Sequence, residues 1–393
     1  MRVARVHIEN FRGIRQALID FSGTAVLLGD NNTGKSTILE AIELAIGPDR
    51  LARSQPIDEH DFHGGDYLGA EGQPQKNIII EVTIAGLDEH LSTRFRNNIE
   101  FWRQTDRTLV GPGQGAVILQ PGIEPAIRIR FVGNYDVEND DFDAKTWFAV
   151  PRDEEGTPTT ECRSHDKREF GFLHLRALRT GSRALSMERG SLLDVILKTY
   201  EVRTKMWEGL LGRLRDLDVV GDSDPEFGRI LTAIRDAMRD IVTGEWADAP
   251  HLRVSELTRE DLRRVLKSFL ATGVAGYGAP FQHQGSGTIN ALVLAMLGLI
   301  AQRRNGRVIF AMEEPELSLP PHVQKRVVDK VRSLASQALF TSHSPYVIEQ
   351  FPPEQMTVLN RDARGILTAT NKSWPRLFGQ RPAGFKWIPA GLC

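Results

Sequence analysis

Residues 29–37 read GDNNTGKST and fit the pattern G-x-x-x-x-G-K-[ST] without a mismatch. An apolar run at residues 25–28 precedes this loop, and a helix-like run at residues 37–46 follows it and ends at Gly47 and Pro48. A strand, a glycine-rich loop and a helix in this order direct backbone N–H groups and the positive end of the helix dipole toward a phosphate. A chance glycine-rich turn before a helix is the alternative, but the Lys-Ser pair and both flanking elements favour nucleotide binding.

The polar residues of this loop have separate expected roles. Lys35 is expected to reach the β- and γ-phosphates of ATP, and Ser36 to place its hydroxyl on Mg²⁺. The remaining residues expected to bind the nucleotide are Gly29, Asn31, Asn32, Thr33, Gly34 and Thr37.

Composition limits the class of protein. A chain of 393 residues that is 41% hydrophobic and 25% charged is typical of a soluble globular protein with one large core or two ordinary ones. Its net charge of −2 means that any nucleic-acid contact requires a local patch. Cys162 and Cys393 have no spacing typical of a disulfide framework or a zinc site. No apolar run reaches the roughly eighteen residues that span a bilayer, so we expect a cytoplasmic protein without membrane contact.

The N-terminal part is predicted to be rich in strands. Residues 3–8 and then 25–28 are expected to form consecutive strands of a small sheet, and the phosphate-binding loop at 29–37, called the P-loop below, follows the second strand. The β-rich runs at 77–84, 126–131 and 146–150 predict an antiparallel meander. One further strand is predicted at 172–175.

Two polar stretches in this part allow more than one interpretation. Residues 50–76 carry carboxylates and imidazoles that resemble metal ligands, but their spacing fits no standard site and favours a solvated surface loop. Four arginines could contact phosphates of ATP or DNA, although a solvated face is the simpler interpretation. They are Arg176, Arg179, Arg183 and Arg189.

The period of the apolar residues becomes helical from Ser191 onward. It continues to Leu214, returns at 227–241, and begins a third time after a capping box at 258–261, with Phe269 on the inner face of that third helix. These apolar stripes are most simply internal packing, although such a unit could also be a dimer contact or a lever. The predicted organisation is an ATPase domain in two parts, 1–190 and 271–370, separated by a helical insert at 191–270 and followed by a tail at 371–393.

A second group of motifs lies after the insert. Residues 282–288 read QHQGSGT and lead into an apolar helix at 289–300, so that Ser286 and Gly287 occupy a glycine-rich helix start suited to an anion. Taken alone, this junction would favour a purely structural interpretation.

The run at 307–312 predicts a buried strand that ends in the sequence EEPE. Acidic residues at the carboxyl end of a parallel strand lie where α/β sheets bind ligands. Glu313 is expected to hold Mg²⁺ and Glu314 to polarise the attacking water. An acidic strand-to-helix turn without function is the less favoured alternative, given the P-loop upstream.

A helix is expected to begin at Pro320 and Pro321, and a strand at 338–341 runs into the sequence SHSP. A hydrolase Ser-His pair would require the nucleophile elbow G-x-S-x-G, which is missing from the sequence. His343 is therefore better suited to sense the γ-phosphate.

This ordered set of motifs resembles the ABC-type ATPases of the SMC/RecF/OLD group, and most of all the OLD (overcoming lysogenisation defect) family. The residues that carry the resemblance are 10–12 (NFR), 29–37, 284–287 (QGSG), 313–316 (EEPE) and 341–345 (TSHSP). The resemblance implies an α/β fold, namely an ABC-type P-loop NTPase with an N-terminal antiparallel β subdomain and a helical insert that acts as an arm or a dimerisation region.

The resemblance also implies a dimer that holds ATP between its subunits. Ser286 and Gly287 of one subunit would contact the γ-phosphate held by Lys35 of the other, His343 would be the switch histidine, and Arg12 would join the nucleotide-binding residues. The QGSG turn departs from the family's LSGGQ, whereas the P-loop fits its pattern without a mismatch.

OLD proteins carry a metal-dependent Toprim nuclease domain after the switch histidine. The residues that follow His343 are too few for that domain and contain Asp362 but no D-x-D pair. The tail follows no family pattern and fits either a natural end or a truncated or frame-shifted reading frame. We therefore expect no nuclease activity from this chain.

The leading hypothesis is an ATPase whose nucleotide-driven dimerisation acts on DNA, in repair or in defence against phage, with a nuclease subunit supplied in trans as one option. The alternative from another class is an ATP-regulated scaffold or sensor that assembles with a protein partner and has little turnover. A small-molecule P-loop kinase is disfavoured because it would not need the Glu-Glu pair or the SHSP turn.

Overall fold

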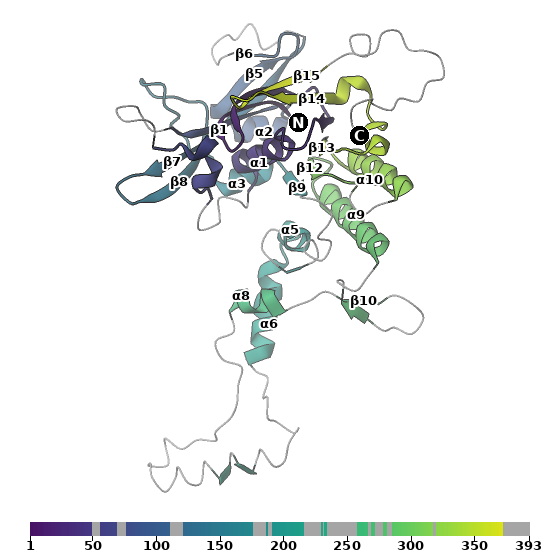
Figure 1. Ribbon diagram of the computed structural model, residues 1–393. Helices are drawn as coiled ribbons and strands as arrows, with labels where there is room; N and C mark the ends of the chain where they lie inside the picture. Colours follow the sequence, from purple (N-terminus) through teal and green to yellow (C-terminus); the bar gives the residue numbers. More distant parts are fainter. Residues whose placement is uncertain are drawn as a thin grey trace. The chain divides into compact units, whose positions relative to one another are not determined.

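The computed structural model describes residues 1–48, 56–68, 76–110, 121–175, 186–187, 191–215, 229–230, 232–233, 258–265, 269–271, 278–280, 285–316 and 320–371. The chain divides into two compact units, the first comprising 1–180 and 286–393 and the second 181–285 (Figure 1). The four arginines considered above, most of the predicted helix at 227–241 and the tail from 372 onward lie outside the described residues.

The first unit is built on one mixed sheet in the order β6-β5-β7-β4-β1-β2-β15-β14-β3-β13-β12-β9, with β8 paired to β7. Its strands are β1 (Arg2–Phe11), β2 (Ile14–Asp20), β3 (Ala25–Leu28), β4 (Ile78–Ala85), β5 (Ile99–Arg103), β6 (Thr108–Val110), β7 (Ile123–Asp136), β8 (Asp141–Phe148), β9 (Phe172–Leu175), β12 (Ile309–Glu313), β13 (Gln337–Thr341), β14 (Met356–Arg361) and β15 (Ile366–Asn371). Helices accompany this sheet: α1 (Lys35–Ile46), α2 (Glu89–Arg94), α3 (Ser164–Glu169), α9 (Ser286–Arg303), α10 (Pro321–Leu334) and α11 (Pro345–Ile348). The predicted α/β class is confirmed.

The antiparallel part of the sheet contains the predicted meander. β4 pairs with β7, and β7 pairs with β8, all antiparallel. The sequence prediction missed β5 and β6, which extend this part beyond β7. The prediction that the strand at 25–28 directly follows the strand at 3–8 is also wrong. β2 comes between them and pairs with β1, because Asn10 and Arg12 adopt positive φ angles of 56° and 50° and turn the chain back.

The parallel part of the sheet contains the P-loop strand β3. It lies between β13 and β14 and is parallel to both. β12 continues the parallel order from β13, and β9 from β12, so the strands predicted at 172–175, 307–312 and 338–341 are confirmed. The C-terminal strands β14 and β15 were not predicted, although β15 joins the P-loop half to the N-terminal hairpin by pairing with β2.

Helix α1 packs on both parts of this sheet, since it contacts β4 and β7 as well as β9 and β13. It begins after Gly34 and ends at Gly47, whose N–H donates to the Glu43 carbonyl, as the sequence predicts. Its apolar face is fully buried, for example at Ile38 and Ile42, and forms one core with the sheet strands. α9 and α10 begin close to their predicted positions and pack on one another.

The prediction of a solvated loop at 50–76 is wrong for residues 57–65. These residues form two short 3-10 turns, η1 (Glu59–Asp61) and η2 (His63–Gly65), around the buried side chains of Ile57 and Phe62. The Phe62 ring packs on Tyr67 and Phe142. The apolar residues within this polar stretch therefore hold it on the core.

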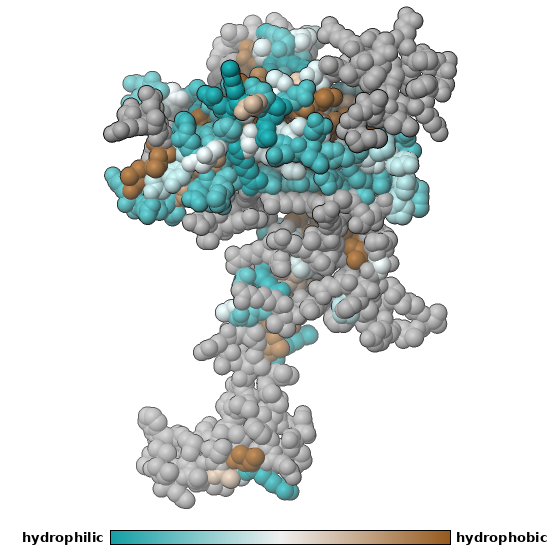
Figure 2. All heavy atoms as spheres, in the orientation of Figure 1, coloured by the Kyte–Doolittle hydropathy of each residue, from teal (hydrophilic) through white to brown (hydrophobic). Residues whose placement is uncertain are grey.

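Hydrophilic residues cover most of the described surface of the first unit in the view of Figure 2, with apolar residues in small groups. In the part of the chain that is described, no helix is both long enough and apolar enough to cross a membrane.

The second unit contains α5 (Leu192–Thr199), α6 (Arg203–Arg215), α8 (Arg259–Val265) and a small antiparallel pair, β10 (Phe269–Ala271) and β11 (Gly278–Pro280). The helical period from Ser191 to Leu214 is divided between α5 and α6, because the chain turns at Glu201 with a φ of 59°. The capping box at Thr258 and Asp261 is confirmed.

The predicted inner face of the third helix is wrong at Phe269. This residue begins β10 instead, and its strand pairs with β11 in the register Phe269↔Pro280. Cross-strand pairing with a segment beyond the window of the helical pattern overrides the local period.

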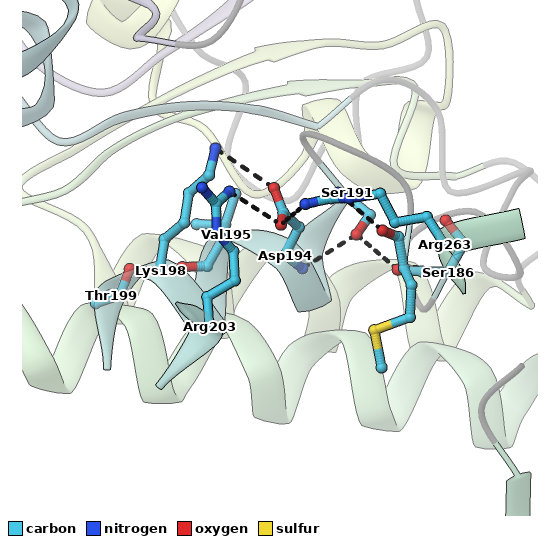
Figure 3. Close-up of polar contacts among 9 residues, drawn as sticks. Ser186, Ser191, Asp194, Val195, Lys198, Thr199, Arg203 and Arg263 are labelled. Atoms are coloured by element: carbon cyan, nitrogen blue, oxygen red, sulfur yellow. Dashed lines mark hydrogen bonds and ion pairs between the residues drawn. The ribbon is translucent and has the colours of Figure 1, made fainter. Parts of the chain in front are cut away.

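Asp194 organises the second unit (Figure 3). Its carboxylate is 2% exposed and lies 3.3 Å from Lys198 and Arg203 and 3.5 Å from Arg263. Since Lys198 belongs to α5, Arg203 to α6 and Arg263 to α8, one buried acid connects three helices. The Arg263 guanidinium also lies over the buried Trp207 ring, 5.3 Å from its centroid.

Candidate ATP-binding and hydrolysis site

The predicted motifs meet at one edge of the sheet. In the parallel register, Leu27 of β3 lies beside Thr341 of β13, and Thr341 lies beside Glu313 of β12. The segments that follow these strands are the P-loop, the SHSP turn and the EEPE segment. Because the carboxyl ends of adjacent parallel strands form one edge, the fold brings these three segments together where α/β sheets bind ligands.

The P-loop has glycine where the backbone requires it. A Cβ at Gly29 would lie 2.9 Å from both the Leu359 carbonyl and Thr33 Oγ1, so a side chain does not fit there. Gly34 has a φ of 106°, a conformation that L side chains rarely adopt. The loop between them is closed by Thr33, whose Oγ1 donates to the Asp30 carbonyl over 2.8 Å. This is the local geometry expected of a phosphate cradle.

Lys35 lies across this loop. Its Nζ donates to the carbonyls of Gly29 and Asp30, each over 2.8 Å, and the residue is 7% exposed. Burial lowers the pKa of the Lys35 ammonium, and the charges of Glu314 and Asp30 partly offset that effect. The charge of Glu314 therefore acts on the Lys35 ammonium.

The donor chemistry expected of a Mg²⁺ site is available at the same edge. Ser36 is exposed in the first turn of α1, and Glu313 ends β12. A hydroxyl and a carboxylate provide the oxygen ligands that Mg²⁺ prefers. Among the described residues no group of three or more His, Cys, Asp and Glu could hold a metal by itself.

The other polar residues of the P-loop are accessible to solvent to different degrees. Asn31 and Asn32 are exposed, and Thr33 and Thr37 are half-buried. Asn32 has a φ of 65°, a left-handed conformation that asparagine tolerates better than most residues.

A buried histidine that the sequence prediction missed contacts Glu313. His174 Nε2 lies 2.8 Å from Glu313 Oε1, a close ion-pair contact whose direction falls short of a linear hydrogen bond. Its Nδ1 lies 3.2 Å from Glu43 Oε2 on α1, and the imidazole is completely buried. The sequence signal was a single imidazole in the apolar strand FLHL. Neither partner could be identified without knowing that β9 lies beside β12.

The charges around His174 favour its protonated form. Burial lowers the pKa of the imidazole, but its contacts with Glu313 and Glu43 together raise the pKa above its usual value. His174 thereby joins the P-loop helix to the strand that carries Glu313.

Glu314 has an unusual backbone. Its φ is 43°, and its N–H donates to the Thr341 carbonyl over 2.9 Å. A non-glycine residue in this region persists only where its surroundings impose it, and such residues cluster at functional sites. The bond fixes the residue after β12 to the end of β13, immediately before the turn that contains His343.

Glu316 and Gln324 hold the SHSP turn. Glu316 Oε1 accepts hydrogen bonds from Ser342 Oγ at 2.9 Å, His343 N at 2.8 Å and Ser344 N at 3.1 Å. Ser344 Oγ donates to Gln324 Oε1 on α10 over 2.6 Å. The sequence prediction placed Glu316 in the motif but gave neither residue a role.

Arg12 is held by two carboxylates that the sequence prediction did not identify. It forms ion pairs of 2.7 Å with Glu40 on α1 and with Asp61. Burial lowers the pKa of its guanidinium, but the contacts with Asp61 and Glu40 raise it by more. Arg12 therefore joins the β1–β2 turn to the P-loop helix, and its predicted contact with nucleotide stays a prediction.

Ser286 and Gly287 are the first two residues of α9. The predicted helix start is therefore confirmed, whereas their contact with a nucleotide on another subunit stays a prediction.

The fold and the P-loop define an α/β nucleotide-binding protein, and comparison with known proteins identifies its family. Residues 1–105 and 229–348, more than half of the chain, match the family described as "AAA ATPase domain". The chain therefore belongs to the AAA ATPase domain family, and the predicted ATPase class is confirmed.

Two curated proteins resemble parts of the chain. It is 34% identical over 102 residues to the DNA double-strand break repair Rad50 ATPase of Methanopyrus kandleri. The matched region covers 26% of this chain and 10% of that protein. It is 46% identical over 114 residues to the retron Ec83 probable ATPase of Escherichia coli, covering 24% of this chain and 20% of that protein. The matched regions thus span a fifth or less of these relatives.

Solved structures of SMC heads are also similar to the chain. An SMC head bound to the C-winged helix domain of ScpA is 11% identical, with a TM-score of 0.47, and the match covers 96% of this chain and 99% of that one. The SMC head domain from Thermotoga maritima is 11% identical, with a TM-score of 0.40, over 94% of this chain and 98% of that one.

Proposed function

We propose that this chain binds and hydrolyses ATP at the edge formed by β3, β13 and β12, and that ATP drives its dimerisation for work on DNA. The observation that carries the proposal is the convergence of three motifs that lie far apart in the sequence. The register of β3, β13 and β12 joins the P-loop, the turn containing His343 and the Glu313-Glu314 pair. These motifs supply the groups that phosphoryl transfer requires, namely a phosphate cradle, a charge sensor and carboxylates.

Each side chain has a role in the proposed reaction. Lys35 and the P-loop N–H groups hold the phosphates, and Glu314 orients the attacking water and accepts its proton. The water oxygen bonds to the γ-phosphorus while the bond to the ADP oxygen breaks, and His343 stabilises charge on the transferred group. Ser36 and Glu313 would hold Mg²⁺, which when bound neutralises phosphate charge. His174 keeps Glu313 in place through its 2.8 Å contact.

The dimer is the second part of the proposal. Ser286 and Gly287 begin a long helix, and free N–H groups at such a start suit an anion. In the proposed dimer they contact the γ-phosphate bound by Lys35 of the other subunit. The OLD-like order of motifs supports this arrangement, which belongs to ABC-type ATPases.

DNA is the proposed partner of the dimer. One relative is named for DNA double-strand break repair, and this name supports action on DNA in repair. Defence against phage is the alternative setting for the same activity. A nuclease subunit supplied in trans is one further partner that such a function could use.

The proposed reaction is tested by phosphate release from ATP with the wild-type chain, Lys35→Ala and Glu314→Gln. We expect Lys35→Ala to abolish nucleotide binding and Glu314→Gln to bind ATP but lose at least about a hundredfold in kcat, the contribution of a general base. Glu349→Gln is the matched control, because this exposed carboxylate forms only a surface ion pair with Lys325. Wild-type turnover by Glu314→Gln would refute its role as the base.

The same assay separates the DNA-dependent ATPase from the ATP-regulated scaffold. Stimulation by duplex DNA that falls steeply with salt is expected, because phosphate contacts release counterions. ATP-dependent assembly with neither turnover nor a DNA effect at low salt would favour the scaffold.

A further inference from the structure

Glu316, the last acid of the EEPE segment, contacts the SHSP turn, called the switch turn below, and has no assigned role in the proposed reaction. Glu316 Oε1 accepts three hydrogen bonds, from Ser342 Oγ and from the backbone N–H groups of His343 and Ser344, at 2.8 to 3.1 Å. Two successive N–H groups directed at one oxygen form a small anion-binding concavity. Here the anion is a side chain of the protein itself.

Further bonds close this connection. Ser344 Oγ donates to Gln324 Oε1 over 2.6 Å, and Gln324 Nε2 lies 3.5 Å from the Glu316 carbonyl. Ser342 is 1% exposed and Gln324 is 8% exposed, so the bonds lie largely out of water. Charge-assisted hydrogen bonds are stronger than neutral ones, and a low dielectric strengthens them further, so Glu316 Oε1 holds the turn firmly. The other carboxylate oxygen, Oε2, is buried without a hydrogen-bond partner among the described residues.

The same two segments are joined once more at their first residues. The Glu314 N–H donates to the Thr341 carbonyl over 2.9 Å. The residues from 314 to 316 and from 341 to 344 are thus connected at both ends. Because Glu314 and His343 lie on these segments, bonds within the protein constrain their separation.

We propose that Glu316 is a positioning residue for His343, and that its carboxylate fixes the switch turn relative to Glu314. The inference rests on the proposed function, because it assigns Glu316 a part in the same ATP hydrolysis. Glu316 holds the main chain of the turn and acts on turnover only through His343. Because the P-loop is a separate segment that supplies most of the proposed phosphate contacts, we expect the loss of the Glu316 carboxylate to change nucleotide affinity little.

Two substitutions at Glu316 test this role. Glu316→Ala removes the acceptor and is expected to lower kcat about tenfold or more, since a displacement of about 1 Å in a reacting group can cost up to a hundredfold. The Kd for mant-ATP is expected to stay within about threefold of wild type. Glu316→Gln keeps an acceptor oxygen and should therefore retain most of the turnover that Glu316→Ala loses. Glu349→Gln again serves as the carboxylate control.

A double-mutant cycle with His343→Ala distinguishes positioning from a general loss of structure. If Glu316 acts through His343, Glu316→Ala causes little further loss of kcat in the His343→Ala background. Additive losses, or a loss of mant-ATP affinity equal to the loss of kcat, would overturn the inference and leave the proposed ATPase intact. A His343→Ala chain with wild-type kcat would instead overturn the proposed role of His343 as well.

Ser342→Ala provides a second route if Glu316→Ala does not fold. It removes one of the three donors and leaves the carboxylate in place, so we expect a smaller fall in kcat with an unchanged mant-ATP Kd. An unchanged kcat in Ser342→Ala, in an enzyme whose turnover depends on His343, would contradict a role for the carboxylate contacts. A larger loss of kcat in Glu316→Gln than in His343→Ala would contradict action through His343.

Discussion

At the scale of single residues, Lys167 is a buried ammonium at the end of the P-loop helix. It is completely buried, and its Nζ donates to the Leu44 carbonyl and to Thr146 Oγ1, each over 2.9 Å. Burial lowers the pKa of Lys167 from 10.5 to about 7, although nearby Cys162 partly raises it. The Leu44 carbonyl belongs to the last turn of α1, where a cation is favoured by the helix dipole.

This pKa predicts a pH-dependent stability. Between pH 7 and 10.5 the unfolded chain binds more protons at Lys167 than the folded chain, so stability rises with pH. The contribution is fully present above pH 10.5 and is lost as the pH falls toward 7. Relative to Lys167→Met, the free energy of unfolding of the wild type should rise by about 2 kcal/mol from pH 7 to pH 9. Denaturant titrations at both pH values check this, and a constant difference would contradict it.

His174 supports a second prediction at this scale. Replacing it with alanine leaves the carboxylates of Glu313 and Glu43 without the cation between them, and should destabilise the first unit by about 3 kcal/mol. His7→Ala is the control, because His7 contacts Glu9 in a half-exposed pair on β1 and should cost less than about 1 kcal/mol. Equal losses of thermal stability in both variants would show that the contacts of His174 contribute nothing special.

At the scale of secondary-structure elements, the second unit depends on one acid. Asp194 contacts basic residues of three helices and has its backbone N–H bonded to Ser191 Oγ over 3.1 Å (Figure 3). Removing one partner of a buried ion pair leaves the other charge uncompensated. Here the buried partner is Arg263.

Asp194→Ala should therefore loosen α5, α6 and α8 together. We expect a loss of about 3 kcal/mol in the stability of the second unit, seen as faster amide exchange in all three helices. Glu208→Ala is the control, since Glu208 and Arg259 form an exposed pair at 3.8 Å. Faster exchange confined to α5 would contradict the account that Asp194 connects the helices.

Elements with a strong local signal could be predicted from the sequence. α1 and α10 have a glycine stop or a proline start, and β12 and β13 are short apolar runs, so each was found near its observed bounds. β2 was missed because its turn depends on positive φ angles at Asn10 and Arg12 rather than on a typical turn sequence. β10 was predicted as helix because its partner β11 lies outside the window in which a helical period is read.

At the scale of the whole chain, what the sequence could not provide is the order of the strands. The position of β9 beside β12 brings His174 to Glu313, and β14 and β15 close the sheet between β3 and β2. Such pairings depend on residues far apart in the sequence, which a local pattern does not encode. The motifs themselves could be predicted, but their support by His174, Glu316 and Gln324 required the fold.

The central claim also concerns the whole chain: we propose that the convergent motifs form one ATP site that closes by dimerisation. The most direct test is to measure the molecular mass of the Glu314→Gln variant in solution with Mg²⁺ and ATP, by size exclusion with light scattering. We expect a dimer with ATP that dissociates with ADP, and no ATP-induced dimer in the double variant that also carries Lys35→Ala. A mass that is the same with ATP, with ADP and without nucleotide would contradict it.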